Sequence, residues 1–242
     1  MVNEMPPTRP RRLPLCEFAP GLLILPEEAA HYIRGVLRLQ SGAAIEVFDG
    51  KGRIAPAQIT RIEGKLVEIS VGDIEQIPPP DLALTLAVAT PKGDRADWLV
   101  EKATELGASA IIWLTCKRSV VVPRKAGKKL ERWTRIAEGA ARQSGRAHTP
   151  SVQGPIPLVS LLEQSFDHRF VCDWSGPSLL SVAAARELKG SLVVVVGPEG
   201  GLSSNELEVL AGAGYNSVSL GPNVLRVETA SVAATATLMG DS

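Results

Sequence analysis

One stretch near the carboxyl end of the chain constrains the fold more than any other. Residues 193–196 are four consecutive valines. Such a β-branched run without polar alternation is typical of a strand that is buried on both faces. The glycine-rich segment 197–201 ends this strand, and Ser203 and Glu206 then have the spacing of a capping box at the start of a helix. The stretch therefore predicts a strand, a tight loop and a capped helix.

A second strand and a second loop follow directly. Residues 218–220 are predicted to form a short strand, which Gly221 and Pro222 end. We expect the two glycine loops to lie at the carboxyl ends of neighbouring strands, where open α/β sheets bind their ligands. The alternative is a pair of purely structural turns, which the presence of two such loops followed by the segment 225–230 disfavours.

The first loop has the wrong chemistry for a phosphate group. Phosphate binding requires free backbone N–H groups without a competing anion, but Glu199 lies inside this loop. The loop also lacks the G-x-G-x-x-G spacing, and no lysine or arginine follows within it. These residues favour a polar ligand that is uncharged or cationic over a diphosphate.

Three motifs in this region carry a resemblance to a known family. They are GPEGGLSSNE from Gly197, GYNSVSLGP ending at Pro222, and VLRVETA ending at Ala230. Together they resemble the carboxyl half of the RsmE family, which are 16S ribosomal RNA uridine N3-methyltransferases of the SPOUT superfamily. The resemblance implies that S-adenosylmethionine is held in a deep trefoil knot and that two subunits complete the site. The cofactor-binding residues that it implies are Val196, Gly197, Pro198, Glu199, Gly200, Gly201, Leu220, Gly221, Leu225, Arg226, Glu228, Thr229 and Ala230.

The reaction that the resemblance implies is transfer of a methyl group to N3 of one uridine, at position 1498 in the family, in the small ribosomal subunit. The uracil imide must lose its N–H proton, so negative charge develops on O2 and O4. A nearby cation stabilises that charge. Arg146 and Arg226 are the candidates for this role. Glu199 is a third catalytic candidate, and whether it acts as a base, a cofactor contact or a structural group stays open.

The amino-terminal part predicts a small β-rich domain over residues 1–76. Residues 1–14 are rich in proline and arginine and are expected to form a loose arm, with RNA gripping as the alternative. The strands are expected at residues 22–25, 43–48, 53–62 and 66–71, with a helix that opens at residue 26. The segments HYIRGVLRLQSG and VFDGKG are similar to the PUA-like domain of RsmE proteins. This similarity implies a β-barrel that helps to hold RNA, with phosphate contacts from Arg34, Arg38, Lys51 and Arg53.

Residues 77–81 contain three consecutive prolines and predict a stiff linker. Beyond it, residues 82–242 alternate between strand and helix, which predicts an α/β domain. The strands are expected at 82–89, 110–114 and 168–174. The helices are expected at 95–106, with Asp94 as its cap, and at 179–188. Residues 150–157 are expected to be a proline-containing connector.

The region 117–146 is strongly basic, with ten lysines and arginines and only two acidic residues. The whole chain has a net charge of zero, so this run predicts a surface that binds the RNA backbone. The alternative is an ordinary solvated face. The segment ARQSGR ending at Arg146 resembles a family motif. The amide of Gln143 has both a donor and an acceptor, which suits it to read a uracil edge. A helix C-cap at Gly145 is compatible with that role. The remaining RNA-binding candidates are Lys117, Arg118, Arg124, Arg142 and Arg146.

Cys16, Cys116 and Cys172 lie far apart, so no disulfide framework and no metal site is expected, and a reducing cytoplasm is the predicted setting. No apolar run has the length of a membrane span. The family resemblance implies that the 16S RNA of the 30S subunit is the partner. Residues 230–239 are rich in alanine and threonine, which predicts a contact between the two copies of a homodimer, with plain core packing as the alternative.

Two positions depart from the family pattern. Asn223 stands where arginine is common, and Val227 stands where threonine is common. The first change removes a cation and the second removes a hydroxyl beside Arg226. The rival functions are a SPOUT methyltransferase that acts on another RNA site, an RNA-binding protein without catalysis, and a nucleotide-binding α/β protein.

Overall fold

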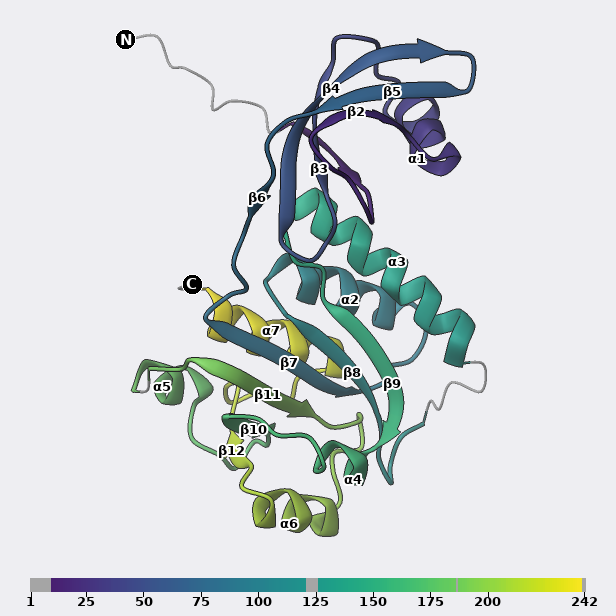
Figure 1. The fold of residues 1–242 in the computed structure, drawn as a ribbon. Helices are drawn as coiled ribbons and strands as arrows, with labels where there is room; N and C mark the ends of the chain where they lie inside the picture. The colour runs from purple at the N-terminus through teal and green to yellow at the C-terminus, as the bar shows by residue number, and fades with distance from the viewer. Residues whose placement is uncertain (1–9, 121–125, 186, 241–242) are drawn as a thin grey trace, which may run out of the picture. The chain divides into compact units, whose positions relative to one another are not determined.

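The computed structural model describes residues 10–120, 126–185 and 187–240 (Figure 1). The chain divides into two compact units. The first contains Met1–Pro79 together with Ala141–His148, and the second contains Pro80–Ala140 together with Thr149–Ser242. The change of unit after Pro79 falls inside the expected linker. We expected one continuous second domain over 82–242. In the structure, residues 141–148 group with the first unit instead.

The first unit is a β-sheet covered by one helical segment. Its strands have the order β1-β3-β4-β5-β2, and β6 pairs with β4. Among the strand pairs described in this unit, β1–β3 is parallel and the others are antiparallel. The helix α1 (Glu27–His31) continues into a π-helical turn, η1 (Tyr32–Val36). The strands are β1 (Arg11–Pro14), β2 (Gly21–Ile24), β3 (Ala44–Phe48), β4 (Arg53–Glu63), β5 (Leu66–Val71) and β6 (Glu75–Gln76).

The predicted loose arm is wrong for residues 11–14, because they form β1. Leu13 is buried in the core of the first unit, and the strand pairs in register with β3. Arg12 is held by Glu46, with Nε and Oε1 2.5 Å apart, and its guanidinium lies 4.2 Å from the centre of the Phe48 ring. A single apolar residue that points inward is therefore sufficient to seat this basic segment as an edge strand. Residues 1–9 lie outside the described part of the chain.

The second unit is built on six parallel strands in the order β12-β10-β11-β7-β8-β9. The predicted connector at 150–157 is wrong, because these residues form β9, which pairs with β8 alone. An edge strand tolerates proline, since one side of its backbone has no hydrogen-bonding partner in the sheet. The strands are β7 (Leu82–Ala89), β8 (Ala110–Thr115), β9 (Ser151–Pro157), β10 (His168–Cys172), β11 (Gly190–Val196) and β12 (Asn216–Val218).

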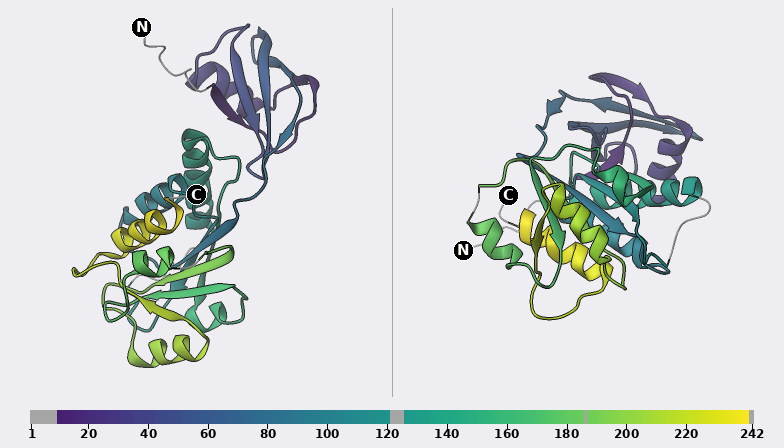
Figure 2. Two further views of the ribbon diagram at one scale, coloured as in Figure 1. Left: turned by 90° about the vertical axis from the view of Figure 1, so that its left-hand side faces the viewer. Right: turned by 90° about the horizontal axis from the view of Figure 1, so that it is seen from below.

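Helices cover both faces of this sheet (Figures 1 and 2). Four helices, α2 (Arg95–Glu105), α3 (Ala126–Ser144), α5 (Leu179–Ala184) and α7 (Val227–Met239), contribute to one face. The other two, α4 (Leu158–Leu161) and α6 (Ser204–Gly212), contribute to the opposite face. The left view of Figure 2 shows α2 and α7 on one side of the sheet and α6 on the other. None of the described helices is long and apolar enough to cross a membrane.

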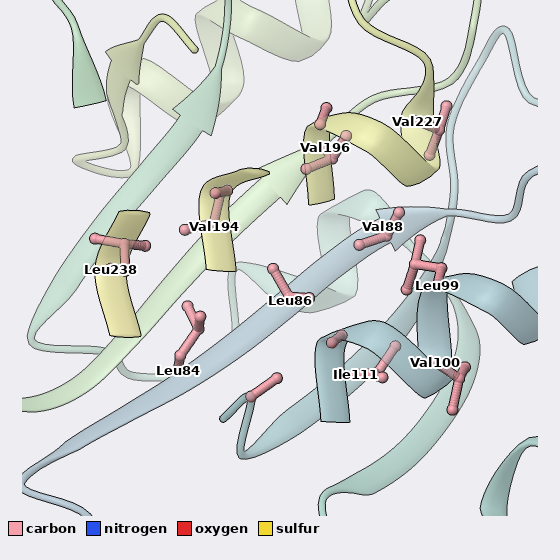
Figure 3. Packing of buried hydrophobic residues seen from close by; sticks show 14 of the residues in the cluster. Leu84, Leu86, Val88, Leu99, Val100, Ile111, Val194, Val196, Val227 and Leu238 are labelled. Atoms are coloured by element: carbon pink, nitrogen blue, oxygen red, sulfur yellow. The ribbon is translucent and has the colours of Figure 1, made fainter. Parts of the chain in front are cut away.

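The valine run of β11 is buried on both faces of the sheet, as predicted. Val194 and Val196 join the core under α2 and α7, where Figure 3 shows them among labelled apolar side chains of β7, α2 and α7. Val193 and Val195 join the opposite core, under α4 and α6. Alternate side chains of a central parallel strand point to opposite faces, and both faces here are covered by helices.

Several element ends differ from the sequence expectation. Asp94 precedes α2, but its side chain makes no capping hydrogen bond. The strand β10 ends at Cys172, because residues 173–176 turn away from the sheet. The strand β12 covers 216–218 rather than 218–220, and α5 ends at Ala184 rather than at residue 188.

Candidate functional site

A cavity of about 440 Å³ lies at the carboxyl ends of β10, β11 and β12. Its walls are the loop after β11 (197–202), the loop after β12 (219–225) and the end of β10 with the two residues that follow it (172–174). The start of α7 closes it through Val227 and Ala230. Its size and its mixture of apolar side chains with a few charged groups are those of a small-molecule site.

Most of the predicted cofactor-binding residues line this cavity. Arg226, Glu228 and Thr229 are the exceptions. The side chains of Arg226 and Thr229 are exposed, whereas Glu228 is buried and its Oε1 lies 3.5 Å from Nε of Arg95. Glu228 therefore holds the start of α7 against α2. The lining residues that were predicted are Val196, Gly197, Pro198, Glu199, Gly200, Gly201, Leu220, Gly221, Leu225 and Ala230.

Sequence reasoning missed the third wall of the cavity. The two glycine loops were expected on neighbouring strands, but β10 lies between β11 and β12. Its carboxyl end therefore brings Cys172, Asp173 and Trp174 to the cavity. The signal was present, because these residues form the carboxyl end of the strand that was predicted at 168–174. The other lining residues that were not predicted as cofactor contacts are Arg118, Leu202, Leu207, Val218, Ser219, Asn223, Val224 and Val227.

The compact conformation of the first loop requires glycine at two positions, Gly197 and Gly201. A Cβ atom on Gly197 would lie 2.9 Å from Cγ of Leu202, closer than such atoms normally approach. Gly201 has a φ angle of +69° and donates its N–H to the carbonyl of Pro198 at 2.8 Å. Arg118 donates to the carbonyl of Gly200 at 2.8 Å, so this predicted RNA contact also supports the loop.

The predicted capping box at the start of α6 is confirmed. Ser203 Oγ accepts from the N–H of Glu206, and the Glu206 carboxylate accepts from the N–H of Ser203. The same carboxylate accepts from the N–H of Lys117 at 2.7 Å, which joins the loop after β8 to the start of α6. Burial acts to raise the pKa of Glu206, but the hydrogen bonds from Lys117 and Ser203 outweigh it and lower the pKa.

We expect Glu206→Gln to lower the free energy of unfolding at neutral pH by about 1 kcal/mol, the usual worth of a helix cap. Because the pKa of Glu206 is lowered in the folded state, its stabilisation is present above the ordinary carboxyl pKa of 4.5 and is lost as the pH falls through the folded value. Urea unfolding at pH 7 and pH 3.5 tests this. The difference between the variant and the wild type should shrink at the lower pH, and a constant or growing difference would contradict the assignment.

The second loop is held by the connection between β10 and α5. Ser219 donates its N–H to the carbonyl of Pro177 at 2.7 Å, and its own carbonyl accepts from the N–H of Leu179 at 2.8 Å. Gly221 has a φ angle of +128° and donates its N–H to Oγ of Ser219 at 3.3 Å. The loop is therefore fixed in place beside the cavity by backbone contacts.

The charges around the cavity agree with the expected ligand chemistry. Its lining contains one basic side chain, Arg118, and two carboxylates, Asp173 and Glu199. Burial raises the pKa of the Cys172 thiol to about 12, so this group is neutral. A diphosphate would meet more negative than positive charge here, whereas an uncharged or cationic ligand is accommodated.

The predicted RNA-binding residues of the first unit differ in whether their side chains already make contacts within the protein. Arg34 donates to the carbonyl of Gly64 at 2.9 Å. Arg53 donates to the carbonyl of Phe18 at 2.8 Å, and its guanidinium stacks over the Phe18 ring. Arg34 and Arg53 therefore have structural contacts, whereas Lys51 and Arg38 are exposed, the latter with a φ angle of +51°.

The ARQSGR segment packs within the first unit. The guanidinium of Arg142 lies 4.7 Å from the centre of the Tyr32 ring, and Arg12 donates to the carbonyl of Arg146 at 2.8 Å. Gly145 has a φ angle of +82° directly after α3, which confirms its conformation at the helix end. Gln143 is exposed, whereas Arg146 is partly buried, and burial lowers its pKa.

The three catalytic candidates thus fall into two groups. Arg146 belongs to the first unit, whereas Glu199 and Arg226 belong to the second. Glu199 lines the cavity, and Arg226 is adjacent in sequence to two residues that line it. Lys117 is exposed, and its backbone N–H contacts Glu206 at the start of α6. Arg124 lies outside the described residues. Within the described ranges, no group of three or more His, Cys, Asp or Glu side chains could hold a metal ion.

Comparison with known proteins gives consistent matches. Residues 78–239 match the model of a family described as an RNA methyltransferase domain, and residues 25–72 match an RNA methyltransferase PUA domain. The ribosomal RNA small subunit methyltransferase E of Bacillus subtilis is 35% identical, with 88% of each chain covered. The protein of the same name from Synechocystis is 34% identical and covers 85% of this chain and 69% of its own.

A solved structure extends this similarity to the fold. The ribosomal RNA small subunit methyltransferase E from Neisseria gonorrhoeae, bound to S-adenosyl methionine, superposes with a TM-score of 0.86 at 31% identity. The alignment covers 96% of this chain and 98% of that one. The similarity thus extends over both the RNA methyltransferase domain and the PUA domain of the chain. The chain belongs to the RsmE family of RNA methyltransferases.

Proposed function

We propose that this protein transfers a methyl group from S-adenosylmethionine to N3 of one uridine in 16S ribosomal RNA of the small subunit. The observation that carries the proposal is the cavity between two glycine loops in a chain of the RNA methyltransferase family. The names of the relatives supply the substrate class, and the uridine N3 target comes from the resemblance of the motifs. The expected position, 1498 in the family, is part of this proposal.

The residues around the cavity fit S-adenosylmethionine. Apolar side chains such as Val196, Leu202 and Val218 suit an adenine ring. The carboxylates of Glu199 and Asp173 suit the positive sulfonium and ammonium groups. When bound, this cofactor supplies an electrophilic methyl group. We propose that the two glycine loops hold it, mainly through backbone groups.

The protein must also stabilise the charge that develops on the uracil oxygens once the N3 proton is lost. We assign this role first to Arg226. Its side chain is exposed, and it stands between Leu225 and Val227, which both line the cavity. Arg146 is the second candidate. Glu199 lies in the cavity wall and is exposed, so it can act as the base that removes the proton, as a cofactor contact or as a structural group. Near-normal turnover of Glu199→Gln would exclude the role of base.

The RNA backbone is proposed to contact the exposed cations. Lys51 and Arg38 present such charges in the first unit, and Lys117 does so in the second. Phosphate contacts of this kind give affinity that falls steeply with salt and carry little sequence information. Arg34, Arg53, Arg118, Arg142, Arg146 and the amide of Gln143 complete the proposed RNA-binding set among the described residues, and Arg124 is proposed from the sequence alone.

We further propose the trefoil knot that the family resemblance implies. Its support is the way in which the end of β12 is enclosed by residues 173–179, which hydrogen-bond to Val218 and Ser219. The chain then runs from β12, at the edge of the sheet beside β10, to α7, which packs on β7 and β11. This connection therefore passes the β10–α5 connection closely.

A homodimer is also proposed, with α7 as the contact. From Ser231 to Met239 this helix has no charged side chain, and its outer positions include the exposed Ala236 and the half-buried Ala233 and Thr237. Small neutral residues allow helices to approach closely. With ribosomal RNA as its substrate, we propose that the protein acts in the cytoplasm.

We expect Ala236→Glu to weaken self-association by more than tenfold, because it places a charge in the proposed contact. Sedimentation equilibrium of the wild type and the variant measures this. The matched control is Ala211→Glu, which adds the same charge to an exposed position of α6, on the opposite face of the sheet. A wild type that is monomeric at micromolar concentration, or equal association of both variants, would contradict the α7 contact.

Calorimetric titration of the protein with S-adenosylmethionine, followed by titration with 16S RNA fragments, separates the enzyme from its rivals. The proposal predicts binding of both. An RNA-binding protein without catalysis would bind the fragments but not the cofactor. A nucleotide-binding α/β protein would prefer ATP or a dinucleotide to S-adenosylmethionine, an outcome that the carboxylates of the cavity oppose.

A further inference from the structure

Trp174 is an exposed aromatic side chain presented at the tip of a tight turn. The turn spans Asp173–Gly176 and is closed by the N–H of Gly176, which donates to the carbonyl of Asp173 at 3.1 Å. Ser175 Oγ donates to the Asp173 carboxylate at 2.8 Å and reinforces the turn. The Trp174 side chain is 86% exposed, which is unusual for so large an apolar group.

The turn rests directly on the backbone of β12. Asp173 donates its N–H to the carbonyl of Val218 at 2.9 Å. A Cβ atom on Gly176 would lie only 2.5 Å from the carbonyl carbon of Ser217, so the two segments are packed as closely as glycine allows. The indole of Trp174 is therefore presented from an anchored base rather than from a long free loop.

Trp174 lies at the mouth of the cavity. It belongs to the lining together with the two glycine loops, yet most of its surface is in solvent. The inner wall has its own apolar side chains, including Val196 and Val218, to receive a cofactor. The second reactant of a methyl transfer must enter at the mouth, since both reactants have to meet in one geometry.

The charges near Trp174 indicate which part of an RNA it contacts. Asp173 is its direct neighbour, and Glu199 lies in another wall of the same cavity. A phosphate group would therefore meet two carboxylates against the single cation of Arg118. An uncharged base would not be repelled. Stacking on an aromatic ring is a common way for proteins to hold an unstacked RNA base. Among the described residues that line the cavity, Trp174 is the only aromatic one.

We propose that the indole of Trp174 stacks on the target base and thereby positions it at the mouth of the cofactor cavity. Trp174 is thus a positioning residue for the methyl acceptor. This inference rests on the proposed function, and it adds a contact that binds the base rather than the phosphates.

The test compares Trp174→Ala, Trp174→Phe and the control Trp98→Phe. Trp98 is also partly exposed, at 43%, but it lies on α2 and does not line the cavity. Trp174→Ala should weaken productive binding of the RNA by about 5- to 150-fold, the loss that follows removal of one base–aromatic stack. Trp174→Phe should retain most of the activity. Calorimetry should give an unchanged Kd for S-adenosylmethionine in all three variants.

Tryptophan fluorescence measures the stacking independently of methyl transfer. An RNA fragment with the target uridine should quench tryptophan emission in the wild type and in Trp98→Phe, but the quenching should be largely lost in Trp174→Phe. The same fragment with the target nucleotide made abasic should quench none of them strongly. Quenching that survives in Trp174→Phe would overturn the assignment.

Other outcomes overturn it in distinct ways. Weaker cofactor binding by Trp174→Ala would assign the ring to the cofactor, and a shift of that variant from dimer to monomer would assign it to a contact between copies. Unchanged RNA and cofactor parameters would leave the ring without either role. Failure of the wild type to transfer methyl groups to any RNA would instead remove the proposed function itself, and this inference with it.

Discussion

Replacement of Gly197 by valine is expected to weaken binding of S-adenosylmethionine by more than about 100-fold. A Cβ atom at this position would already lie 2.9 Å from Cγ of Leu202, and the two methyl groups of valine would occupy the cavity wall. Overpacking of this kind costs about 1–3 kcal/mol even where no ligand is displaced, and here the lost volume is that of the ligand site. Calorimetric titration with the cofactor measures the effect.

Two variants serve as controls for this result. A Cβ atom on Gly200 would make ordinary contacts of 3.5 Å with Arg118, so Gly200→Ala should change the affinity less than threefold. Gly212→Ala, at the end of α6, meets nothing within 4 Å and should have no effect on binding. Thermal unfolding of each variant separates a lost site from a lost fold. Near-normal cofactor affinity in a folded Gly197→Val protein would mean that the ligand does not use this loop.

Removal of the Arg226 guanidinium is expected to lower kcat by about 10²- to 10³-fold, the usual effect of deleting a group that stabilises developing negative charge. Because Arg226 does not itself line the cavity, the cofactor Kd of Arg226→Ala should stay within about threefold of the wild type. The kcat of Arg226→Lys should fall between those of the wild type and Arg226→Ala, since lysine retains the positive charge but loses the planar set of guanidinium donors. Single-turnover methyl transfer with saturating cofactor measures the rate.

Arg135→Ala is the matched control for charge alone. Arg135 is exposed on α3 and lies outside the cavity lining, so its loss should lower RNA affinity slightly at low salt and leave kcat unchanged. A near-normal kcat in Arg226→Ala would shift the assignment to Arg146, whose replacement would then show the larger loss.

The parts of the fold that follow local rules could be predicted. The strand 193–196 has a buried pattern of its own, and the capping box of Ser203 and Glu206 depends on a spacing of three residues. The strand 66–71 alternates between buried and partly exposed positions and was predicted to the residue. In each case the forces that decide the structure act between residues that are close in the sequence.

The parts that depend on distant pairing could not be predicted. The order of β10, β11 and β12 decides which strand ends meet, so the third wall of the cavity, with Trp174, was missed. The segment 11–14 forms a strand because β3 is available to pair with it. Residues 141–148 group with the first unit through contacts such as that of Arg12 with the carbonyl of Arg146, which are 134 residues apart.

Val227 illustrates how a departure from the family pattern can be accommodated. The expected threonine hydroxyl is absent, but the Val227 side chain is only 3% exposed and packs in the core beneath α2 and α7. Asn223, the other departure, lines the cavity and is exposed. The first change therefore suits the core, whereas the second leaves the mouth of the cavity without one positive charge.

The most direct test of the proposed function is transfer of labelled methyl groups from S-adenosylmethionine to 30S subunits that lack the modification, with the modified base mapped. The proposal predicts label on N3 of a single uridine of 16S RNA, at the position equivalent to 1498 in the family. Label at a different RNA site would retain the enzyme but contradict the assigned target. No label on any RNA, from a protein that is folded and saturated with cofactor, would contradict the function itself.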